Sequence, residues 1–458
     1  HLGRASRVDE YAVASLKFPS GIVAQLATGV QLSMENVVRV FGSEGWILVP
    51  EPWLPGQEGR ASTIVVHREG GDGPEEVVVE SDLGLYSLEV DAVAAHLDAG
   101  QAPPPAMTWE DSLGNMKTLD LWRQSIGLVY DSERLEAPVR SLTDCPLRVR
   151  AESKMKYGWV PGLDTPVARA VMGVDNQATM PHAAVMFDDY FERGGNCFDT
   201  AYIYMGGLGE RLLGRWVEAR DVRDQVVIVG KGAHTPWNRP GHLRQQLEQS
   251  LERLQTDHVD VYLAHRDNAE IPVAEWVDAF KELVHEGMAR AYGVSNWSID
   301  RIEAANAYAS KKGLVAIAAV SNNFSLARMV DPVWPGCIAA SDPDSRSWFA
   351  RTQMPLLAWS SQARGFFAGP AHPDDRSDEE LVRCWYSEDN FRRLARAEEL
   401  AKKRGVLPIN IALAYVLAQP FPTFALIGPR TLAETRSAAR GLEVELTTEE
   451  VRWLNLEE

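Results

Sequence analysis

Residues 197–204 (CFDTAYIY), 226–232 (VVIVGKG) and 259–266 (VDVYLAHR) are the stretches of sequence that decide the fold. Each begins as a short apolar run, ends in polar residues and is followed by a helix-like stretch. Strands that alternate with helices are typical of parallel sheets, because a parallel pair needs a helical crossover. In a closed barrel of parallel strands, all the carboxyl ends face one mouth, where active sites form. The pattern therefore predicts a barrel in which these polar residues meet.

Short apolar runs of this kind recur along the chain, with helical stretches between them. The runs are VARAVMG (167–173), NCFDTA (196–201), VVIVGKG (226–232), VDVYLAH (259–265), AYGVSN (291–296), AIAAVSN (316–322), MPLLAWS (354–360) and TFALIG (423–428). This alternation predicts an α/β fold, a (β/α)8 TIM barrel, over residues 161–458. A doubly wound open sheet is the alternative, but no GxGxxG motif follows any strand.

One helical stretch between the runs carries leucines at i, i+4, i+8 and i+11. These are Leu243, Leu247, Leu251 and Leu254. Residues at this spacing lie on one face of a helix. The sequence therefore predicts a helix over this stretch that buries a single leucine stripe.

Four polar residues at the strand ends have side chains that suit carbonyl reduction: Asp199, Tyr204, Lys231 and His265. A tyrosine hydroxyl is a weak acid with a reference pKa of about 10, and a nearby ammonium should lower the pKa of Tyr204. Asp199 would keep Lys231 charged, and His265 could orient a carbonyl oxygen. Any one of them alone could be structural. Four in register at the same end of successive strands instead predict a catalytic site.

From about residue 155 onward, the chain resembles the aldo-keto reductases, which are NAD(P)(H)-dependent enzymes built on a (β/α)8 barrel. The resemblance is carried by GGNCFDTAYIY, LGERLLG, SLERLQTDHVDVYLAHRDN, GVSNWS and LLAWSSQARGFF. It implies that the four polar residues form the family's catalytic tetrad, with Tyr204 as the general acid. Tyr202 is close by, but the spacing from Asp199 favours Tyr204.

The same resemblance implies positions for a bound NADP(H) or NAD(H). Ser295 and Asn296 match the family's pair that holds the nicotinamide carboxamide, and Ser321 stands where a Gln normally completes this grip. Phe324 matches the aromatic residue that would stack on the nicotinamide ring, where many relatives have Tyr. The change from Gln affects the carboxamide contacts rather than the use of the cofactor.

Two later segments resemble the loops that cover the rest of the cofactor. WSSQARGFF resembles the loop over the pyrophosphate, and LIGPRTLAE resembles the adenosine-binding end. The residues implied are Ser360, Ser361, Arg364, Gly365, Gly428, Arg430 and Thr431. Arg430 and Thr431 would favour a 2′-phosphate, whereas Glu434, where an Arg is often found, would repel it. The two signals conflict, and the choice between NAD and NADP stays open.

Residues 1–145 show antiparallel rather than parallel signals. YAVASLKFPSGIVAQLATG, VVRVFGSEGWILV and STIVVHREGGDGPEEVVVE each indicate strands around a turn. Helices are expected to follow at about Tyr86–Leu97 and Thr108–Tyr130, and Thr108 with Asp111 predicts a capping box. These residues are therefore expected to form an α+β domain with a mostly antiparallel sheet. A linker over 146–160 would join this domain to the barrel.

This first domain resembles the C-terminal domain of the glucose–fructose oxidoreductase and inositol dehydrogenase family. The resemblance is carried by DEYAVASLKFPSGIVAQLATG, RVFGSEGWILV and WRQSIG. In that family a Rossmann domain precedes the sheet, and the sheet mediates dimerisation. The resemblance implies a piece of a longer fusion protein that starts at His1 and lacks the Rossmann portion. It makes the N-terminal sheet a candidate interface for a homo-oligomer or for the missing portion.

The composition is that of a soluble enzyme. A net charge of -18 disfavours nucleic acid and anionic membrane surfaces as partners. No apolar run approaches the ~18 residues of a membrane span, and the N-terminus has no signal-peptide pattern. Four scattered cysteines and the lack of an HExxH motif argue against a metal or a disulfide. Reduced thiols predict a cytoplasmic location. Five histidines are expected at the surface or at helix ends: His182, His234, His242, His258 and His285.

The sequence leaves the substrate open. Trp237, Trp297 and Trp334 fall in loops at the expected barrel mouth, where they could stack on sugar rings or apolar carbonyl compounds, or simply pack. We expect an NAD(P)(H)-dependent oxidoreductase that reversibly reduces an aldehyde or ketone, and the fused domain suggests a sugar-derived one. One alternative is a cofactor-binding regulatory or assembly module without significant turnover. Another is a complete fusion that oxidises on one module and reduces on the other, giving net isomerisation.

Overall fold

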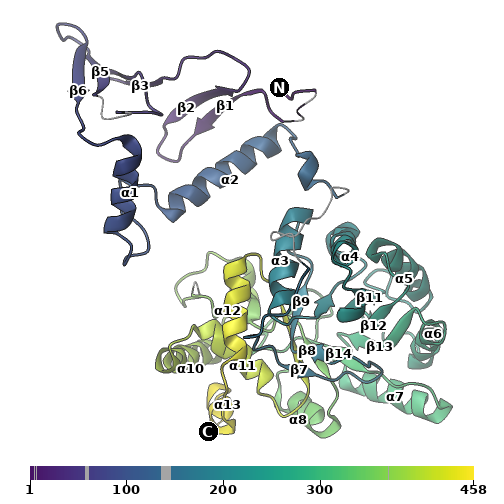
Figure 1. Ribbon diagram of the computed structural model, residues 1–458. Coiled ribbons are helices and arrows are strands. Elements are labelled where there is room, and N and C mark those ends of the chain that lie inside the picture. Colours follow the sequence, from purple (N-terminus) through teal and green to yellow (C-terminus); the bar gives the residue numbers. More distant parts are fainter. Residues whose placement is uncertain (5, 7, 57–60, 136–145, 370, 458) are drawn as a thin grey trace. The chain divides into compact units, whose positions relative to one another are not determined.

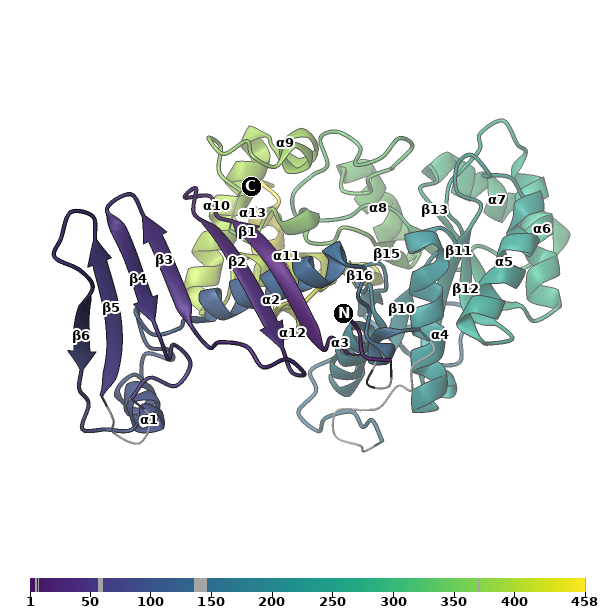
Figure 2. The same ribbon diagram turned by 90° about the horizontal axis from the view of Figure 1, so that it is seen from above.

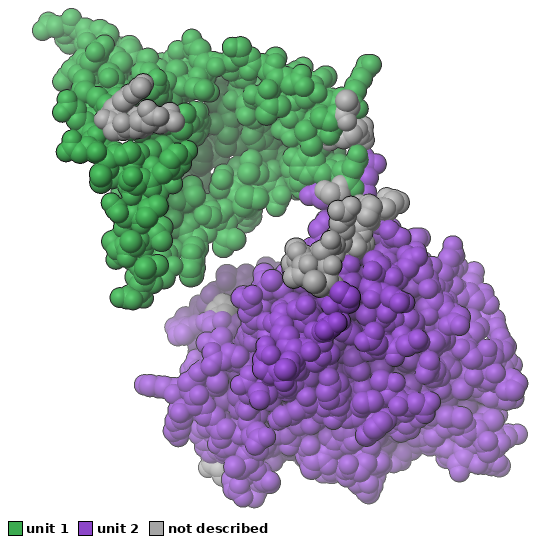
Figure 3. All heavy atoms as spheres, viewed as in Figure 1, with its two compact units in different colours: residues 1–131 green, residues 132–458 purple. Residues whose placement is uncertain are grey.

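The computed structural model describes residues 1–4, 6, 8–56, 61–135, 146–369 and 371–457. The chain divides into two compact units, residues 1–131 and 132–458 (Figure 3). The domain boundary expected at residue 145 lies outside the described residues, and the two units divide ahead of it.

The first unit combines antiparallel strands with helices (Figures 1 and 2). Its strands are β1 (Tyr11–Lys17), β2 (Val23–Gly29), β3 (Val38–Gly42), β4 (Gly45–Val49), β5 (Ser62–Arg68) and β6 (Glu75–Val79). β1 and β2 form a two-stranded sheet, and β3 to β6 form a four-stranded sheet in chain order. Every pairing is antiparallel, as expected, but the strands form two sheets rather than one.

Helices α1 (Leu85–Ala95) and α2 (Trp109–Ser125) follow these strands. The capping box of α2 is confirmed: the Asp111 N–H donates to Thr108 Oγ1, and the Thr108 N–H donates to the Asp111 carboxylate. Among the described residues of this unit, Leu128 is the one hydrophobic side chain that is buried. Large apolar side chains such as Val13 and Phe41 are 74% exposed. The unit therefore leaves an unusually large share of its apolar surface uncovered.

The second unit is built around a closed barrel of parallel strands. The strands are β9 (Ala170–Gly173), β10 (Cys197–Asp199), β11 (Val227–Gly232), β12 (Val259–Ala264), β13 (Ala289–Ser295), β14 (Ala319–Ser321), β15 (Leu356–Ala358) and β16 (Thr423–Ile427). They pair in chain order, and β16 pairs back with β9. The predicted (β/α)8 barrel is confirmed, and its closure excludes the open doubly wound sheet.

Helices surround this barrel (Figure 1). They are α3 (Met180–Glu192), α4 (Leu208–Arg220), α5 (Gly241–Leu254), α6 (Val273–His285), α7 (Ile299–Lys312), α8 (Pro343–Thr352), α9 (Glu379–Trp385), α10 (Glu388–Arg404), α11 (Pro408–Leu417), α12 (Leu432–Leu442) and α13 (Thr448–Leu454). The leucine stripe expected on α5 is buried along its whole length. Within the described part of the chain, no helix is both long enough and apolar enough to span a membrane.

One predicted strand is split in two. Residues 167–173 were expected as a single strand, but β8 (Val167–Ala168) pairs antiparallel with β7 (Tyr157–Gly158), and the barrel starts only at β9. Arg169 separates the two strands, because its guanidinium donates hydrogen bonds to the backbone carbonyls of Thr423 and Leu417. The segment expected as a linker thus contains β7, which is part of the second unit.

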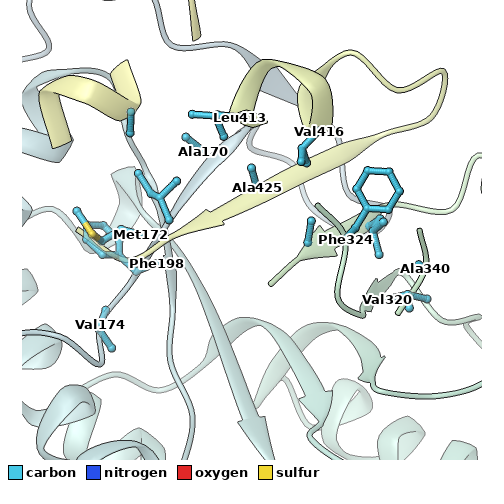
Figure 4. Packing of buried hydrophobic residues seen from close by; sticks show 14 of the residues in the cluster. Ala170, Met172, Val174, Phe198, Val320, Phe324, Ala340, Leu413, Val416 and Ala425 are labelled. Carbon is cyan, nitrogen blue, oxygen red and sulfur yellow. The ribbon is translucent and has the colours of Figure 1, made fainter. Parts of the chain in front are cut away.

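Side chains alternate along the barrel strands between an inner and an outer cluster. On β11, Val227 and Val229 lie in the inner cluster, whereas Ile228 lies in the outer cluster, between strands and helices. Figure 4 shows part of the outer cluster, with Phe198 of β10 among its members. Two residues beyond Val229, Lys231 continues the inward series of β11.

The same alternation sets the direction of the other strand-end residues. Cys197 of β10 and Leu263 of β12 both lie in the inner cluster. Asp199 and His265 each stand two residues further along, so both continue an inward series. The period-two pattern of three strands therefore places three polar side chains in the topmost layer of the barrel interior.

Candidate active site

Lys231 lies at the centre of the four predicted catalytic residues. Its Nζ donates hydrogen bonds to Asp199 Oδ2 at 2.5 Å, to the carbonyl oxygen of Thr200 at 2.9 Å and to Tyr204 Oη at 3.2 Å. The side chains of Lys231 and Asp199 are buried, whereas the Tyr204 ring is partly exposed. One ammonium group thus links a carboxylate in the barrel interior to the hydroxyl of a tyrosine at the barrel mouth.

His265 also contacts the Tyr204 ring. The two rings meet edge to face, with their centroids 5.6 Å apart. A second histidine, His234 in the loop after β11, contacts His265 in the same manner at 4.8 Å. The structure thus brings together all four residues expected from the sequence. It also corrects the expectation for His234, which is half-buried at the barrel mouth; its position three residues after Lys231 was the available signal.

Burial dominates the acid–base properties of Tyr204. It raises the pKa of Tyr204 to about 12, and this effect outweighs Lys231, which lowers the pKa. The expectation that Lys231 would bring this pKa below its usual value is therefore wrong for this structure. At neutral pH the hydroxyl is protonated, and it can act as a proton donor.

The ion pair beneath Tyr204 stays charged. Burial alone would lower the pKa of Lys231, but Asp199 and Tyr204 together raise it above its usual value. Burial raises the pKa of Asp199, although the contact with Lys231 works in the opposite direction. Because the two side chains are hydrogen-bonded, each offsets the desolvation of the other. An ammonium group is therefore fixed beside the Tyr204 oxygen.

His265 is held in its neutral form. Burial, with Lys231, His234 and Arg266 adding to it, lowers the pKa of His265 well below its usual value. Its Nδ1 is buried and has no hydrogen-bond partner among the described residues. A neutral imidazole keeps one N–H, which can donate a hydrogen bond to a carbonyl oxygen without competing for the proton of Tyr204.

The residues expected to hold a carboxamide lie together at the ends of β13 and β14. Ser295 and Ser321 are paired in the strand register, and Ser295 Oγ donates to the Ser321 carbonyl at 2.9 Å. Asn296 has a positive φ of 57° and donates through Nδ2 to Ser295 Oγ at 3.0 Å. Ser321 Oγ is buried without a partner among the described residues. That hydroxyl could donate to or accept from a bound planar amide.

Phe324 is not part of this group. It is fully buried within the outer cluster (Figure 4). Its ring stacks parallel to Tyr415 at 6.1 Å, and Phe421 packs edge-on at 5.9 Å. Both faces belong to the core, so the ring has no open face for a nicotinamide. Trp359 directly follows β15 and is only partly buried, with the exposed Trp334 6.2 Å away. Sequence reasoning missed Trp359, although it stands at a strand end within WSSQARGFF.

The loop after β15 has an unusual backbone. Ser360 and Arg364 adopt positive φ of 48° and 51°, and Gly365 follows at 93°. Ser361 is anchored to the neighbouring strand, because its Oγ donates to the carbonyl of Leu426 on β16 at 2.7 Å. Arg364 donates to Glu380 at 2.6 Å. The loop is thus tied to the next strand and shaped tightly enough to present backbone groups to a phosphate.

The connection from β16 to α12 holds the remaining predicted cofactor residues. The Gly428 carbonyl accepts a hydrogen bond from Asn176 at 3.1 Å. Glu434 accepts from the N–H of Arg430 at 2.5 Å and of Thr431 at 3.3 Å, and Thr431 closes a capping box. Barrels frequently bind phosphate at the loops after their last two strands. Here a carboxylate already occupies the helix N-terminus.

The three tryptophans differ in role. Trp297 is buried against Trp276 in the core, whereas Trp237 and Trp334 are 56% and 48% exposed. The described residues contain no cluster of three or more His, Cys, Asp or Glu side chains that could hold a metal ion. A shallow surface hollow lies at the end of α5, on the amino-terminal side of β12, and includes none of the residues above.

Comparison with known proteins agrees with the barrel. The sequence profile of the Aldo/keto reductase family matches residues 169–455. This match covers more than half of the chain, so the chain belongs to the Aldo/keto reductase family.

Individual relatives are distant. The "Uncharacterized oxidoreductase YrpG" of Bacillus subtilis (strain 168) is 28% identical over 322 residues, covering 66% of this chain and 95% of the relative. Norsolorinic acid reductase A of Aspergillus parasiticus is 27% identical over 302 residues, covering 62% of this chain and 72% of the relative. An aldo-keto reductase from Klebsiella pneumoniae, solved in complex with NADPH, superposes with a TM-score of 0.51 at 23% identity. The superposition covers 66% of this chain and 94% of that structure. This last likeness shows the shared fold.

Proposed function

We propose that this protein is an NAD(P)(H)-dependent oxidoreductase that reduces an aldehyde or ketone to an alcohol, with Tyr204 as the general acid. The observation that carries the proposal is the hydrogen-bonded series Asp199–Lys231–Tyr204, with neutral His265 edge-on to the tyrosine. A buried ion pair is costly unless good geometry and further hydrogen bonds offset the desolvation of its two charges. Here it fixes a cation 3.2 Å from the Tyr204 hydroxyl, which can give up a proton at the barrel mouth.

Each side chain has a separate task in this reaction. His265 donates its N–H to the carbonyl oxygen and so places it beside Tyr204 Oη. As negative charge develops on that oxygen, Tyr204 transfers its proton. The phenolate left behind is stabilised by the Lys231 ammonium, because the two atoms are already in hydrogen-bond contact. Asp199 keeps Lys231 charged throughout.

The residues around the mouth fit a nicotinamide cofactor. A bound reduced nicotinamide would supply the hydride. The unpaired hydroxyl of Ser321 and the fixed amide of Asn296 could hold the carboxamide, with the carbonyl acceptor above them. Trp359 replaces Phe324 as the aromatic side chain that could cover a ring. The loop containing Ser360 and Gly365 could face the pyrophosphate.

The protonation state of Tyr204 favours reduction over oxidation near neutral pH. The alcohol-to-carbonyl direction requires a phenolate as base, and a pKa of about 12 makes that form rare. The carbonyl-to-alcohol direction requires the protonated hydroxyl, which is the dominant form. The chemistry is reversible, but this site provides an acid more readily than a base.

The first test is a fluorescence titration with NADH and with NADPH, followed by consumption of each cofactor with a panel of aldehydes, ketones and keto-sugars. Binding with turnover supports the proposal and shows which cofactor is used. Cofactor binding without turnover on the whole panel would contradict it and would favour a regulatory or assembly module. The Tyr204→Phe variant is the control, because it removes the hydroxyl but keeps the buried Asp199–Lys231 ion pair, so it should retain the fold and lose most of the turnover.

A further inference from the structure

Arg266, the residue after His265, is a buried cation without an acidic partner. The residue is 6% exposed, and its one hydrogen bond to a described residue runs from Nη2 to the sulfur of Cys337 at 3.4 Å. No carboxylate among the described residues forms an ion pair with it. A thiol is a weak acceptor, so most of the hydrogen-bonding capacity of this guanidinium group is unused.

The nearby acidic groups are already engaged. Asp267 accepts two hydrogen bonds from Arg301, at 2.8 and 3.0 Å. Asp199 is bound to Lys231. The positive charge of Arg266 is therefore not neutralised by either neighbouring carboxylate. This charge acts on the two histidines. Burial is the largest cause of the lowered pKa of His234 and of His265, and the charge of Arg266 lowers both pKa values further.

The contact with Cys337 shows where Arg266 lies. The next residue, Ile338, donates its N–H to Asn296 Oδ1 at 3.1 Å, and its carbonyl accepts from the Asn323 N–H at 2.9 Å. The loop that carries Cys337 is thus tied to the ends of β13 and β14. Arg266 contacts this loop through Cys337 and directly follows His265 in the chain, so it lies close to the catalytic mouth.

The cofactor phosphates do not account for this charge. Arg266 follows β12, whereas the phosphate-binding loops of barrels follow the last two strands, here β15 and β16. In the closed order of eight strands, β12 and β16 are four positions apart, on opposite sides of the barrel. An anion beside Arg266 therefore belongs to the molecule that occupies the other half of the mouth.

We propose that Arg266 binds a carboxylate group of the carbonyl substrate, so that the preferred substrates are aldehydes or ketones bearing a carboxylate. The proposal rests on the proposed function, because it names the substrate class of the same site. A buried arginine without a counter-ion is costly, and a bound carboxylate would supply both the charge and two parallel acceptors. One uncompensated charge suits a monoanion better than a doubly charged phosphate.

The test compares paired substrates with the intact protein. Succinic semialdehyde is paired with butanal, 4-carboxybenzaldehyde with 4-methylbenzaldehyde, and glyceraldehyde 3-phosphate with glyceraldehyde. We expect kcat/KM to be at least about tenfold higher for the carboxylated member, mainly through KM. In Arg266→Gln this preference should fall by about 10- to 100-fold, and Arg266→Lys should restore part of it. A preference for the phosphorylated member alone would overturn the assignment to a carboxylate.

Cys337→Ala is the matched control, because it removes the one hydrogen-bond partner that Arg266 has in the described part of the chain and keeps the charge. If Arg266 merely anchors the Cys337 loop, Cys337→Ala should reproduce the loss seen in Arg266→Gln. Under the proposal it keeps the carboxylate preference. Equal losses for charged and neutral substrates in Arg266→Gln would also overturn the proposal.

Binding separates this proposal from the proposed function. Calorimetric titration of 4-carboxybenzaldehyde and of 4-methylbenzaldehyde needs no turnover. We expect tighter binding of the carboxylated compound by the natural protein and loss of that difference in Arg266→Gln. If all neutral aldehydes are reduced but no difference in binding exists, the anion site is wrong and the reductase stands. If the difference in binding exists without any turnover, the reductase assignment fails and the anion site stands.

Discussion

At the residue scale, the chemistry depends on where one cation is fixed. Lys231 Nζ contacts both a carboxylate and a phenol oxygen, and it lies 4.7 Å from the centre of the Tyr204 ring. The ammonium group is therefore placed to stabilise the product of proton transfer rather than to ionise the tyrosine beforehand. Tyr204 therefore stays protonated until a carbonyl oxygen gains negative charge and accepts its proton.

The pH dependence of the two directions should differ. Because the pKa of Tyr204 is raised to about 12, the hydroxyl is protonated throughout the neutral and mildly alkaline range. We expect kcat/KM for carbonyl reduction to show no loss from Tyr204 ionisation up to about pH 10, whereas alcohol oxidation should rise steadily with pH. Steady-state rates from about pH 6 to 10 test this. A reduction rate that falls with a pKa near 7 would contradict it.

The tetrad could be predicted from the sequence, but the fine geometry around it could not. Asp199, Lys231 and His265 follow from strand alternation, which is a local pattern. The raised pKa of Tyr204 depends on how deeply its hydroxyl is covered, which no local pattern encodes. The ring of Phe324 packs against Tyr415 and Phe421, both about 90 residues or more away in sequence. Because this long-range packing buries the Phe324 ring, the ring cannot stack on a nicotinamide as the sequence suggested.

At the element scale, the helix that follows each strand determines what the strand end can bind. The N-terminus of α12 is closed by its own side chain, since Glu434 accepts from the N–H groups of Arg430 and Thr431. An anion that approached this helix would meet a carboxylate rather than free N–H groups. The sequence showed basic and acidic residues with opposite effects on a 2′-phosphate. In the structure, the Glu434 carboxylate takes the N–H groups at the N-terminus of α12 that such a phosphate would need.

Glu434→Arg should shift the cofactor ratio toward NADPH. The substitution removes a carboxylate and adds a guanidinium that can pair with a 2′-phosphate. We expect the NADPH/NADH ratio of kcat/KM to rise about tenfold or more, with a loss of about 1 kcal/mol of stability from the lost cap. Glu434→Gln keeps the capping hydrogen bonds without the charge and should give an intermediate ratio. An unchanged ratio in Glu434→Arg would show that no 2′-phosphate approaches this helix.

The α5 helix tests the packing of the barrel wall. Leu247 is fully buried in the outer cluster, so Leu247→Ala should cost about 2–5 kcal/mol of the free energy of unfolding. Its neighbour Glu248 has a side chain that is 55% exposed, so Glu248→Ala should cost less than about 0.5 kcal/mol. Urea unfolding of the two variants measures both. Similar losses would mean that the leucine stripe does not support the barrel.

The elements themselves were predictable to differing degrees. Seven of the eight barrel strands lie within segments expected from their apolar pattern, because closed parallel sheets bury whole strands. The exception is β13, which begins at Ala289, two residues before its expected segment. The β7–β8 hairpin was missed, since Tyr157 and Gly158 pair with residues that also looked like part of a barrel strand. Arg169 ends that strand through hydrogen bonds to Thr423 and Leu417, over 240 residues away, a contact the local sequence could not reveal.

At the scale of the whole molecule, the two units differ in how well they bury their apolar side chains. The second unit has an extensive core, whereas Leu128 is the one buried hydrophobic side chain in the described part of the first unit. We propose that the sheets of the first unit form an association surface, as the resemblance to glucose–fructose oxidoreductase C-terminal domains suggests. Its exposed strands and apolar side chains support this proposal.

Removal of residues 1–131 should therefore change the oligomeric state without abolishing reductase activity. We expect residues 1–458 to associate in a concentration-dependent manner and residues 132–458 to be monomeric, by light scattering after size-exclusion chromatography. Both should bind NADH or NADPH with similar affinity, because every proposed cofactor residue lies in the second unit. If residues 1–458 stay monomeric at high concentration, the proposed association surface is contradicted.

The measurement that tests the central claim most directly is the turnover of Tyr204→Phe beside Tyr202→Phe. The two tyrosines lie in the same segment, but Tyr202 Oη donates to Gln249 at 2.8 Å, whereas Tyr204 Oη contacts Lys231. We predict that Tyr204→Phe lowers kcat by about 10²–10⁴-fold with cofactor binding intact, and that Tyr202→Phe stays within a few-fold of the natural protein. Full activity in Tyr204→Phe would contradict the assignment of Tyr204 as the general acid.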